Sequence, residues 1–347
     1  MTFLVYGAYG YTGELVSRAA VERGFDPILA GRDGDALREL GRELRRSVRE
    51  FGLSIPEVVA DTVRDVDAVL NCAGPFADTA VPLVDACIET GTDYLDVAGE
   101  WRVLAELAAR DAEAAAAGVT LLPGVGFDVV PTDCLAAALV ERLPDATSLA
   151  LGVDVDGAVS RGTARTAVRA LGEDPVVRES GALVSRPPGG GRRIDFGRGE
   201  RVAMPASLGD VVTAAHTTGV DTVSVHVALP RRARRLHRLA GALGPLVRSR
   251  PVRWVIDRLV ATRVEGPTAA ERASTTAYVW GETRTDDGAT ATERLRTPDP
   301  YDLTVETSLS AVERVLAGGV DAGFRTPAGA FGPGFVDAMD GVRWLDR

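Results

Sequence analysis

The sequence contains no lysine, so all 39 of its basic residues are arginine. A chain without lysine cannot form a Schiff base through a side-chain amine, and it cannot use lysine as a general acid or base. Only three histidines are present (His216, His226 and His237), and so few argue against a metal site built from several histidines. These two shortages exclude Schiff-base mechanisms and leave no expectation of a metal site.

Cysteine is as scarce as histidine. Cys72, Cys87 and Cys134 have no C-x-x-C spacing and no neighbouring histidine, so we expect reduced cysteines in or near the core rather than metal ligands or a disulfide. The sequence also lacks an apolar run of about 18 residues and a basic, apolar leader, from which we expect no transmembrane helix and a cytoplasmic protein. The net charge of −10 argues against general nucleic-acid binding.

The first residues carry the strongest positive signal. An apolar, β-prone run, Thr2–Tyr6, leads directly into Gly7-Ala-Tyr-Gly10-Tyr-Thr-Gly13, and a helical stretch follows to Arg23. This is the strand-turn-helix context that a dinucleotide-binding glycine signature requires. Gly7 would turn the chain sharply, Gly10 would let backbone N–H groups approach a pyrophosphate, and Gly13 would let the helix pack close to the sheet. The spacing G-x-x-G-x-x-G is a variant of the dehydrogenase signature G-x-G-x-x-G.

The first half of the chain alternates strands and helices in the doubly wound manner. Six parallel strands joined by right-handed crossovers make a Rossmann-type α/β sheet. We expect strands at Thr2–Tyr6, Pro27–Ala30, Glu57–Val59, Ala68–Asn71, Tyr94–Val97 and Thr120–Leu122, and helices at Tyr11–Arg23, Gly34–Phe51, Thr79–Thr90 and Trp101–Ala117.

The pattern changes after Pro131, where alternating β segments are separated by long, turn-rich stretches. This organisation indicates a second, α+β domain with a mixed or mainly antiparallel sheet. We expect its strands at Ser148–Val155, Val223–Ala228, Thr275–Glu282 and Tyr301–Glu306, a surface turn at Arg186–Arg193 and a helix at Leu309–Gly318. The predicted domains are residues 1–131, which bind a cofactor, and residues 132–324, which bind substrate or form a dimer.

The residue at the end of the second strand indicates which nicotinamide cofactor is bound. An acidic side chain there bonds to the ribose 2′-hydroxyl of NAD, whereas an arginine accommodates the 2′-phosphate of NADP. Ala30-Gly31-Arg32 places a guanidinium at this point, so we expect NADP in preference to NAD. Asp33, next to it, has capping of the following helix as its plain role.

Two further segments are candidates for contact with the cofactor. Asp61, at the end of the expected third strand, is placed to touch the adenine ring, and its alternative role is a loop cap. Cys72-Ala-Gly-Pro-Phe76 follows the fourth strand, at the place where the chain usually passes beneath the nicotinamide ribose. A plain turn is the alternative interpretation of Gly74 and Pro75, but the location favours contact with the cofactor.

Several short motifs occur together in one order. They are Gly7-Ala-Tyr-Gly-Tyr-Thr-Gly13, Ala30-Gly-Arg32, Asn71-Cys-Ala-Gly-Pro-Phe76, Tyr94-Leu-Asp-Val-Ala-Gly-Glu100 and Gly126-Phe-Asp-Val-Val-Pro-Thr-Asp133. The set resembles the saccharopine dehydrogenase-like superfamily. The later segments make the chain similar to the branch that contains trans-acting enoyl reductases and saccharopine dehydrogenase-like oxidoreductases. These segments are Arg161-Gly-Thr-Ala164, Gly209-Asp210, His216-Thr-Thr-Gly219, Thr326-Pro-Ala and Phe331-Gly-Pro333.

The resemblance implies an N-terminal domain that binds NAD(P), and a second domain inserted before a C-terminal segment, residues 325–347, that returns to the first. It implies reduction of a C=C (enoyl) or C=N bond in a lipid-like or small substrate. A true saccharopine dehydrogenase is disfavoured, because the second domain offers no evident cluster for a dicarboxylic amino acid. The predicted cofactor-binding residues are Gly7, Ala8, Tyr9, Gly10, Tyr11, Thr12, Gly13, Arg32, Asp61, Cys72, Ala73, Gly74, Pro75, Phe76, Gly126 and Phe127.

The catalytic residues are less clearly indicated than the cofactor site. Hydride comes from the cofactor, so the protein supplies geometry, electrostatics and often a proton. A proton donor should lie near the carboxyl ends of strands four to six, where Tyr94, Glu100 and Asp128 fall. The alternative role of Glu100 and Asp128 is to cap the helices that follow them or to fix loops. His216 of the second domain is a fourth candidate, in a strand-like stretch where a structural role is its alternative.

Two non-enzymatic hypotheses stay open beside the enzyme. One is an NADP-binding protein without catalysis that acts as a redox sensor or scaffold. The other is a lipid-associated protein whose apolar and basic stretch Leu236–Val264 contacts a partner or a membrane, although packing on the second domain is the simpler interpretation. Arg161 and Arg165 are candidates for binding an anionic substrate group, and a homodimer is a further hypothesis.

Overall fold

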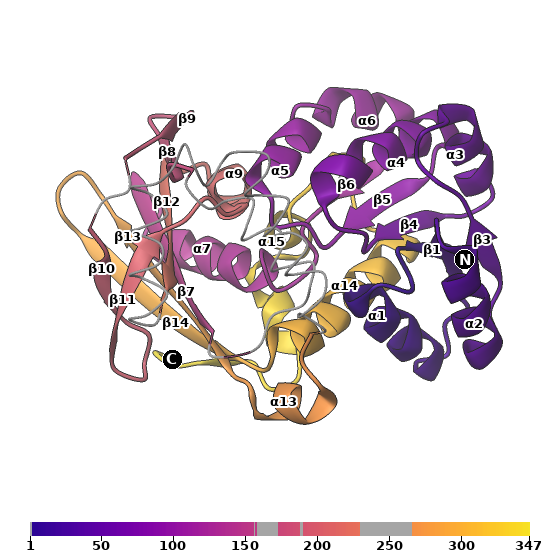
Figure 1. Cartoon of the computed structure of the whole chain (residues 1–347). Helices are drawn as coiled ribbons and strands as arrows, with labels where there is room; N and C mark the ends of the chain where they lie inside the picture. Colours follow the sequence, from indigo (N-terminus) through magenta and orange to yellow (C-terminus); the bar gives the residue numbers. More distant parts are fainter. Residues whose placement is uncertain (1, 156, 158–172, 188–189, 230–265) are drawn as a thin grey trace. The chain divides into compact units, whose positions relative to one another are not determined.

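Figure 1 shows the structure of the chain, a computed structural model. It describes residues 2–155, 157, 173–187, 190–229 and 266–347, to which all structural statements refer. The chain divides into two compact units, one from residues 1–130 and 301–335 and the other from residues 131–300 and 336–347. The chain re-enters the first unit at residue 301, earlier than the expected return at 325, and residues 336–347 lie with the second unit.

The first unit is built on a sheet of seven strands that are all parallel, which confirms the predicted doubly wound α/β class. Its strand order is β15-β6-β5-β4-β1-β2-β3, so the direction of winding reverses between β1 and β4. Ligands of such sheets bind outside the carboxyl ends of the strands at this reversal. The strands are β1 (Phe3–Tyr6), β2 (Ile28–Gly31), β3 (Val48–Glu50), β4 (Ala68–Asn71), β5 (Asp93–Asp96), β6 (Thr120–Leu122) and β15 (Gly323–Phe324).

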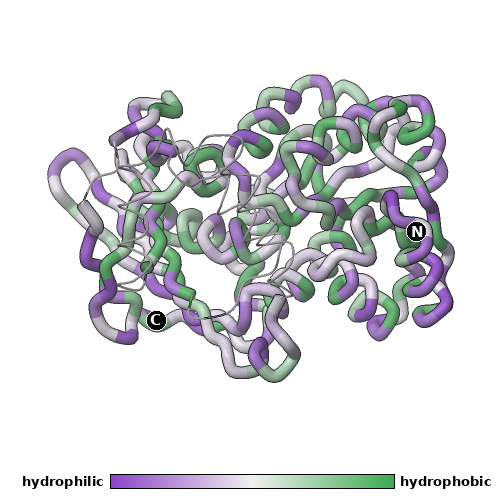
Figure 2. Tube along the Cα trace, in the orientation of Figure 1, coloured by the Kyte–Doolittle hydropathy of each residue, from purple (hydrophilic) through white to green (hydrophobic). Residues whose placement is uncertain are grey.

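Helices cover both faces of the sheet. Its central strands are therefore buried on both sides and consist mainly of apolar residues. All residues of β1 and β4 are buried, as expected for parallel strands covered on both faces. In Figure 2 the apolar segments follow the strands, whereas the outlying α2 is largely polar. The helices are α1 (Tyr11–Glu22), α2 (Gly34–Leu44), α3 (Pro56–Val63), α4 (Phe76–Thr90), α5 (Trp101–Ala108), α6 (Asp111–Ala117), α14 (Pro300–Leu316) and α15 (Pro327–Phe331).

The third strand is not where the sequence predicted it. Residues Glu57–Val59 lie inside α3, which begins with a proline at its first position, and the true strand β3 is Val48–Glu50. The prediction was wrong because Val-Val near a loop suggested a strand, although proline at the first helical position favours a helix. The expected helix Gly34–Phe51 accordingly ends at Leu44, where Arg45 adopts a left-handed conformation.

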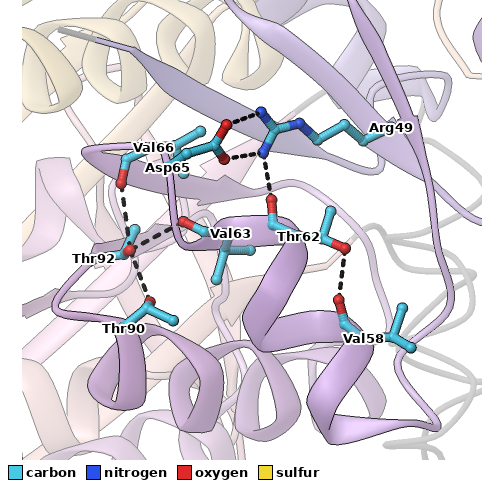
Figure 3. A network of polar contacts seen from close by, with 8 residues as sticks. All are labelled: Arg49, Val58, Thr62, Val63, Asp65, Val66, Thr90 and Thr92. Atoms are coloured by element: carbon cyan, nitrogen blue, oxygen red, sulfur yellow. Dashed lines mark hydrogen bonds and ion pairs between the residues drawn. The ribbon is translucent and has the colours of Figure 1, made fainter.

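A polar network fastens β3 to the turn that follows α3 (Figure 3). The guanidinium of Arg49 forms two bonds to the carboxylate of Asp65, at 2.6 and 2.8 Å, and one to the Thr62 carbonyl. The hydroxyl of Thr92 lies 3.2 Å from the Val63 carbonyl oxygen on the other side of this turn. The turn between α3 and β4 is therefore held by Arg49 of β3 on one side and by Thr92, which directly precedes β5, on the other.

The second unit contains a mixed sheet of nine strands, as the sequence predicted in outline. Only β7 and β12 pair in parallel among its neighbours, and the other pairs are antiparallel. Its strands are β7 (Ser148–Val155), β8 (Val176–Glu179), β9 (Ala182–Ser185), β10 (Arg192–Asp195), β11 (Glu200–Pro205), β12 (Thr222–Ala228), β13 (Ala277–Arg284), β14 (Thr290–Thr297) and β16 (Arg343–Trp344), and its helices include α7 (Val130–Arg142), α9 (Asp210–Thr218) and α13 (Ala269–Ser274).

Close packing of α7 on this sheet depends on a glycine. A Cβ atom at Gly281 of β13 would overlap Leu135 and Leu139 of α7. The predicted strand Tyr301–Glu306 is wrong, because these residues form the first turns of α14, which also contains most of the predicted helix Leu309–Gly318. Among the helices of the described ranges, none has the length and apolar character needed to cross a bilayer.

Candidate functional site

The turn after β1 has a shape that only glycine allows at two positions. Gly7 has a φ of +80°, and a Cβ atom there would lie 2.7 Å from Cβ of Ala73. A Cβ atom at Gly13 would overlap the carbonyl oxygen of Gly7 and lie 3.0 Å from Cα of Ala8. The N–H groups of Gly7 and Ala8 donate to the carbonyl of Ala30, at 2.8 and 3.1 Å. The turn is thus held tightly between β2 and the loop after β4.

The N-terminus of α1 has no side-chain cap. Its N-cap is Gly10, which has no side chain with which to cap the helix, and the Gly10 N–H itself donates to the Gly7 carbonyl at 2.9 Å. Glu14 of the first turn bonds to Arg18, at 2.8 Å, rather than to the helix start. The first N–H groups of a helix carry a partial positive charge and lack acceptors within the helix. This end of α1 can therefore hold a phosphate group.

Arg32 directly follows β2, the strand that pairs with β1, and β1 leads into this turn. Its side chain is exposed, and no carboxylate within the described ranges pairs with it. Tyr9 packs its ring against Gly31, where a Cβ atom would lie 2.6 Å from the ring. Burial raises the pKa of Tyr6 to about 12, Tyr9 adds to the rise, and the nearby charge of Arg32 opposes it. Asp33 caps α2 by accepting from the Ala36 N–H at 3.1 Å, as the sequence suggested.

Asn71 at the end of β4 fixes the loop that meets the glycine turn. Its side-chain oxygen accepts from the Ala73 N–H at 3.0 Å, and its amide nitrogen donates to the Thr79 hydroxyl at 3.1 Å. Thr79 in turn donates to the Ala73 carbonyl at 2.7 Å. Both polar groups of the Ala73 backbone are therefore bonded, and Ala73 is the residue against which Gly7 packs. Asn71 was not among the predicted site residues.

The other residues of the predicted segment Cys72–Phe76 differ in exposure. Cys72 is buried, and burial, with the charge of Asp96 as a second cause, raises the pKa of its thiol to about 12. That thiol is protonated at neutral pH and does not act as a nucleophile. Gly74 is exposed, and Phe76 begins α4.

Tyr94 and Asp96 of β5 extend this hydrogen-bonded set across the sheet. The Tyr94 hydroxyl accepts from the Asn71 amide at 3.1 Å and donates to the Asp96 carboxylate at 2.9 Å. The other carboxylate oxygen of Asp96 accepts from the N–H groups of Ala98 and Gly124, both at 2.9 Å. Burial raises the pKa of Asp96 to about 6, against these donors. Asn71, Tyr94 and Asp96 are all completely buried.

Glu100 caps α4 from outside that helix. Its carboxylate accepts from the N–H groups of Phe76 and Ala77, at 3.1 and 3.3 Å. The N-cap of α4 is Pro75, whose side chain cannot accept a hydrogen bond. A carboxylate at a helix N-terminus is stabilised by the partial positive charge there. The Glu100 side chain thus caps α4, the helix before it, and makes no cap on α5, the helix that follows.

Asp128 is the exposed carboxylate of this site. A Cβ atom at Gly99 would lie 2.7 Å from Cβ of Asp128, so the Asp128 side chain rests directly on the Gly99 backbone. The described residues give it no hydrogen bond or ion pair. Its pKa is raised, first by desolvation and second by the negative charge of Glu100, although the side chain is exposed and solvent screening works against both causes. The Phe127 N–H donates to the Thr304 hydroxyl of α14 at 3.0 Å, which fixes this loop.

The remaining predicted residues lie elsewhere. Asp61 is an exposed residue of α3, 3.5 Å from Arg64, and not at the end of a strand, so the reason for predicting its contact with adenine is wrong. His216 lies in the second unit, on the exposed side of α9, a helix and not a strand. Arg161, Arg165 and Leu236–Val264 are outside the described residues. Within those residues no group of three or more His, Cys, Asp and Glu is arranged to hold a metal ion.

Comparisons with known proteins agree with this geometry. Residues 3–122 match the family model of the saccharopine dehydrogenase NADP-binding domain. The trans-acting enoyl reductase of Mycobacterium leprae is 31% identical over 148 residues, which cover 40% of this chain and 35% of that protein. The human saccharopine dehydrogenase-like oxidoreductase is 31% identical over 152 residues, covering 38% of this chain and 35% of that protein. The matched part therefore spans about a third of the length of these relatives, and the predicted resemblance is confirmed.

One solved structure matches along almost the whole chain. Apo saccharopine dehydrogenase (L-Glu forming) from Saccharomyces cerevisiae has a TM-score of 0.66 and 13% sequence identity, with 99% of both chains covered. At this identity the likeness establishes a common fold for the two chains and nothing about the reaction.

Proposed function

We propose that this chain, whose residues 3–122 belong to the saccharopine dehydrogenase NADP-binding domain family, is an NADP-dependent oxidoreductase. The observation that carries the proposal is the presence of two features together: a helix start at Gly10 without a side-chain cap, and an exposed Arg32 at the end of β2 that has no carboxylate partner among the described residues. NADP has phosphate groups at two separate places, and these two donors suit them. The helix start would hold the pyrophosphate, and Arg32 would hold the 2′-phosphate.

The preference for NADP over NAD rests on the charge at the end of β2. Arg32 is free to form two parallel bonds to a phosphate, which is the geometry that a guanidinium favours. Asp33 is engaged as the cap of α2 and is not available to a ribose 2′-hydroxyl through the oxygen that bonds to Ala36. The end of β2 therefore supplies a positively charged partner for the 2′-phosphate of NADP.

When bound, the cofactor supplies the hydride, and reduction of a C=C or C=N bond also needs a proton. We assign the proton to Asp128, because its carboxyl is exposed, has no hydrogen-bond partner among the described residues and has a raised pKa. Glu100 remains bonded to the start of α4 and acts on Asp128 through its charge. Tyr94 is completely buried and does not reach a substrate in this conformation. His216 stays a candidate for orienting the substrate.

The substrate class is inferred from the relatives. Their names describe an enoyl reductase, which acts on C=C bonds, and a saccharopine dehydrogenase-like oxidoreductase. We therefore propose a lipid-like or small substrate with a C=C or C=N bond. The absence of lysine from the sequence is compatible with either reduction, since neither requires a side-chain amine.

Titration with NADPH and with NADH, followed by fluorescence, tests the cofactor. We expect saturable binding of NADPH and weaker binding of NADH. Oxidation of NADPH is then followed at 340 nm with a panel of enoyl thioesters and of imines formed from amines and keto acids. Turnover of either class supports the enzyme; binding without turnover of any compound favours the sensor or scaffold, and no binding of either nucleotide at millimolar concentration contradicts the proposal.

A further inference from the structure

One chain of hydrogen bonds joins three loops at the carboxyl edge of the first unit's sheet. It runs from the Ala73 backbone through Asn71, Tyr94 and Asp96 to the backbone of Gly124. The three side chains come from adjacent strands β4 and β5, and all are completely buried. None of them can touch a ligand directly. The two ends of this series of hydrogen bonds, however, are backbone groups of the loops that carry the candidate site.

We infer that Tyr94 is a positioning residue whose hydroxyl sets the placement of the loop after β4 relative to the loop after β6. This inference rests on the proposed function, because it concerns the loops that would hold NADP. At one end, Ala73 packs against Gly7 of the phosphate-binding turn. At the other, Gly124 leads into the loop that carries Asp128. A shift in the hydrogen-bond chain would therefore move the turn and the proton donor relative to each other.

At Tyr94 the hydrogen bonds are matched: the hydroxyl accepts one and donates one. Asn71 uses its oxygen for Ala73 and its amide for Thr79 and Tyr94, so its orientation is fixed. The Tyr94 hydroxyl accepts once and donates once, and it is the partner of the Asp96 Oδ2 atom. Removal of this hydroxyl would leave a buried amide hydrogen and a buried carboxylate oxygen without partners. Unpaired buried polar groups are costly, so the loops would shift to find others.

This series of hydrogen bonds requires an ionised Asp96, which accepts at both carboxylate oxygens. A protonated carboxyl loses an acceptor site, and its hydrogen would compete with the Tyr94 hydroxyl. The groups that act on Asp96 are its donors Tyr94, Ala98 and Gly124, and the negative charge of Glu100, which raises its pKa. The Cys72 thiol is also near, with the Asp96 charge raising its pKa. Loss of the Tyr94 hydroxyl would raise the pKa of Asp96 further, because that hydroxyl stabilises the charged form.

Thr92 provides a matched control on the same strand segment. It precedes β5 at the amino end of the sheet, is buried, and its hydroxyl contacts the carbonyl oxygens of Val63 and Val66, at 3.2 and 3.3 Å (Figure 3). Thr92→Val thus removes a buried hydroxyl from the opposite edge of the sheet, away from the loops after β4 and β6. A merely structural effect should be similar in Thr92→Val and Tyr94→Phe.

The experiment measures NADP⁺ affinity by calorimetry between pH 5 and 8 for wild type, Tyr94→Phe and Thr92→Val, after circular dichroism has shown each to be folded. We expect binding to Tyr94→Phe to be weaker by about tenfold at pH 7.5, and binding to Thr92→Val to stay within about twofold. The pH midpoint of binding should rise in Tyr94→Phe only. Titration of the ligand's own phosphate is common to all three proteins and does not affect this difference.

Two results distinguish a failure of this inference from a failure of the proposed function. Wild-type protein that binds no nucleotide would contradict both. Wild type that binds, together with a Tyr94→Phe variant that behaves like Thr92→Val, would overturn the positioning role and leave the proposed function intact. If Tyr94→Phe does not fold, Thr79→Val takes its place, since it removes the half-buried hydroxyl that bonds to Asn71 and to the Ala73 carbonyl. A Thr79→Val protein with wild-type affinity and midpoint would likewise overturn the inference.

Discussion

The carboxylate of Glu100 bonds to the N–H group of Phe76, at 3.1 Å, and so caps a helix that begins 24 residues earlier in the chain. This contact ties the start of α5 to the start of α4. It also keeps a negative charge beside Asp128, whose pKa it raises. One side chain thus links the stability of a helix with the protonation of its neighbour.

Replacement of Glu100 should separate these two effects. Glu100→Ala removes the cap of α4 and is expected to lower the free energy of unfolding by about 1 kcal/mol, measured by urea denaturation. Glu100→Gln keeps a hydrogen-bond acceptor and should cost less. Both variants remove the negative charge, so the pKa of Asp128 should fall in both, as followed by carboxyl ¹³C NMR. An unchanged Asp128 titration in Glu100→Gln would show that Glu100 does not act on it.

Arg32 is expected to determine the choice of cofactor. Arg32→Ala should weaken NADPH binding by about 10- to 100-fold, because charge-assisted hydrogen bonds to phosphate contribute about 1.5–3 kcal/mol. NADH binding should change little. Arg38→Ala is the matched control, since Arg38 is an exposed arginine of α2 that pairs with Asp35 and Glu50. Equal losses for NADPH and NADH in Arg32→Ala would place the 2′-phosphate elsewhere.

Gly13 should not tolerate even one methyl group. A Cβ atom there overlaps the Gly7 carbonyl, so Gly13→Ala has to push α1 away from the turn, at a cost of about 1–3 kcal/mol. We expect loss of NADPH binding together with a lower melting temperature. Gly52→Ala serves as the control, because a Cβ atom at Gly52 meets nothing within 4 Å. Wild-type affinity in Gly13→Ala would mean that the phosphate does not bind at this turn.

The pair Arg49–Asp65 should make stability depend on pH in the acid range. Arg49 lowers the pKa of Asp65 in the folded state, so the pair stabilises the protein above the unfolded-state pKa, and this contribution is lost as the pH falls through the lowered value. Because Asp65 is largely exposed, solvent screening limits the contribution to less than about 1 kcal/mol.

Asp65→Asn should therefore reduce stability at pH 7 and have less effect near pH 2, as measured by thermal melts. Asp61→Asn is the control, since the Asp61–Arg64 pair is exposed and 3.5 Å apart. The same control tests the predicted contact of Asp61 with adenine: its position in α3 leads us to expect unchanged NADPH affinity. An Asp65→Asn protein as stable as wild type at pH 7 would contradict the role of the pair.

The buried parallel strands were the most predictable part of the fold. Ala68–Asn71 and Thr120–Leu122 have the predicted bounds. A short apolar run between turn residues is typical of a buried strand and too short for a helix. β3 was missed because Val-Arg-Glu is polar and owes its strand conformation to pairing with β2. Tyr301–Glu306 was assigned to a strand, yet Pro300 at the head of this segment suits a helix start.

The glycine turn and Arg32 were selected because the residues that indicate their roles are adjacent in the sequence. Asn71 and Asp96 were not selected, although each is a polar residue at the carboxyl end of a strand. Their partners lie on other strands and loops, up to 28 residues away in sequence. Nothing in a single sequence states that Asp96 faces Gly124. A polar residue that ends a buried strand is nonetheless a signal that could have selected both.

The strand β15 has a consequence for the order in which the protein is made. It pairs with β6 through Gly323 and Phe324, about 200 residues after β6 has been synthesised, and α14 reaches the Phe127 loop over a similar separation. During translation the edge of β6 therefore stays without its neighbour until about 200 further residues have been synthesised. An unpaired edge strand is a site for association with other chains. The glycine turn after β1 can form early in synthesis, whereas the loop that carries Asp128 gains its contact with Thr304 only 177 residues later.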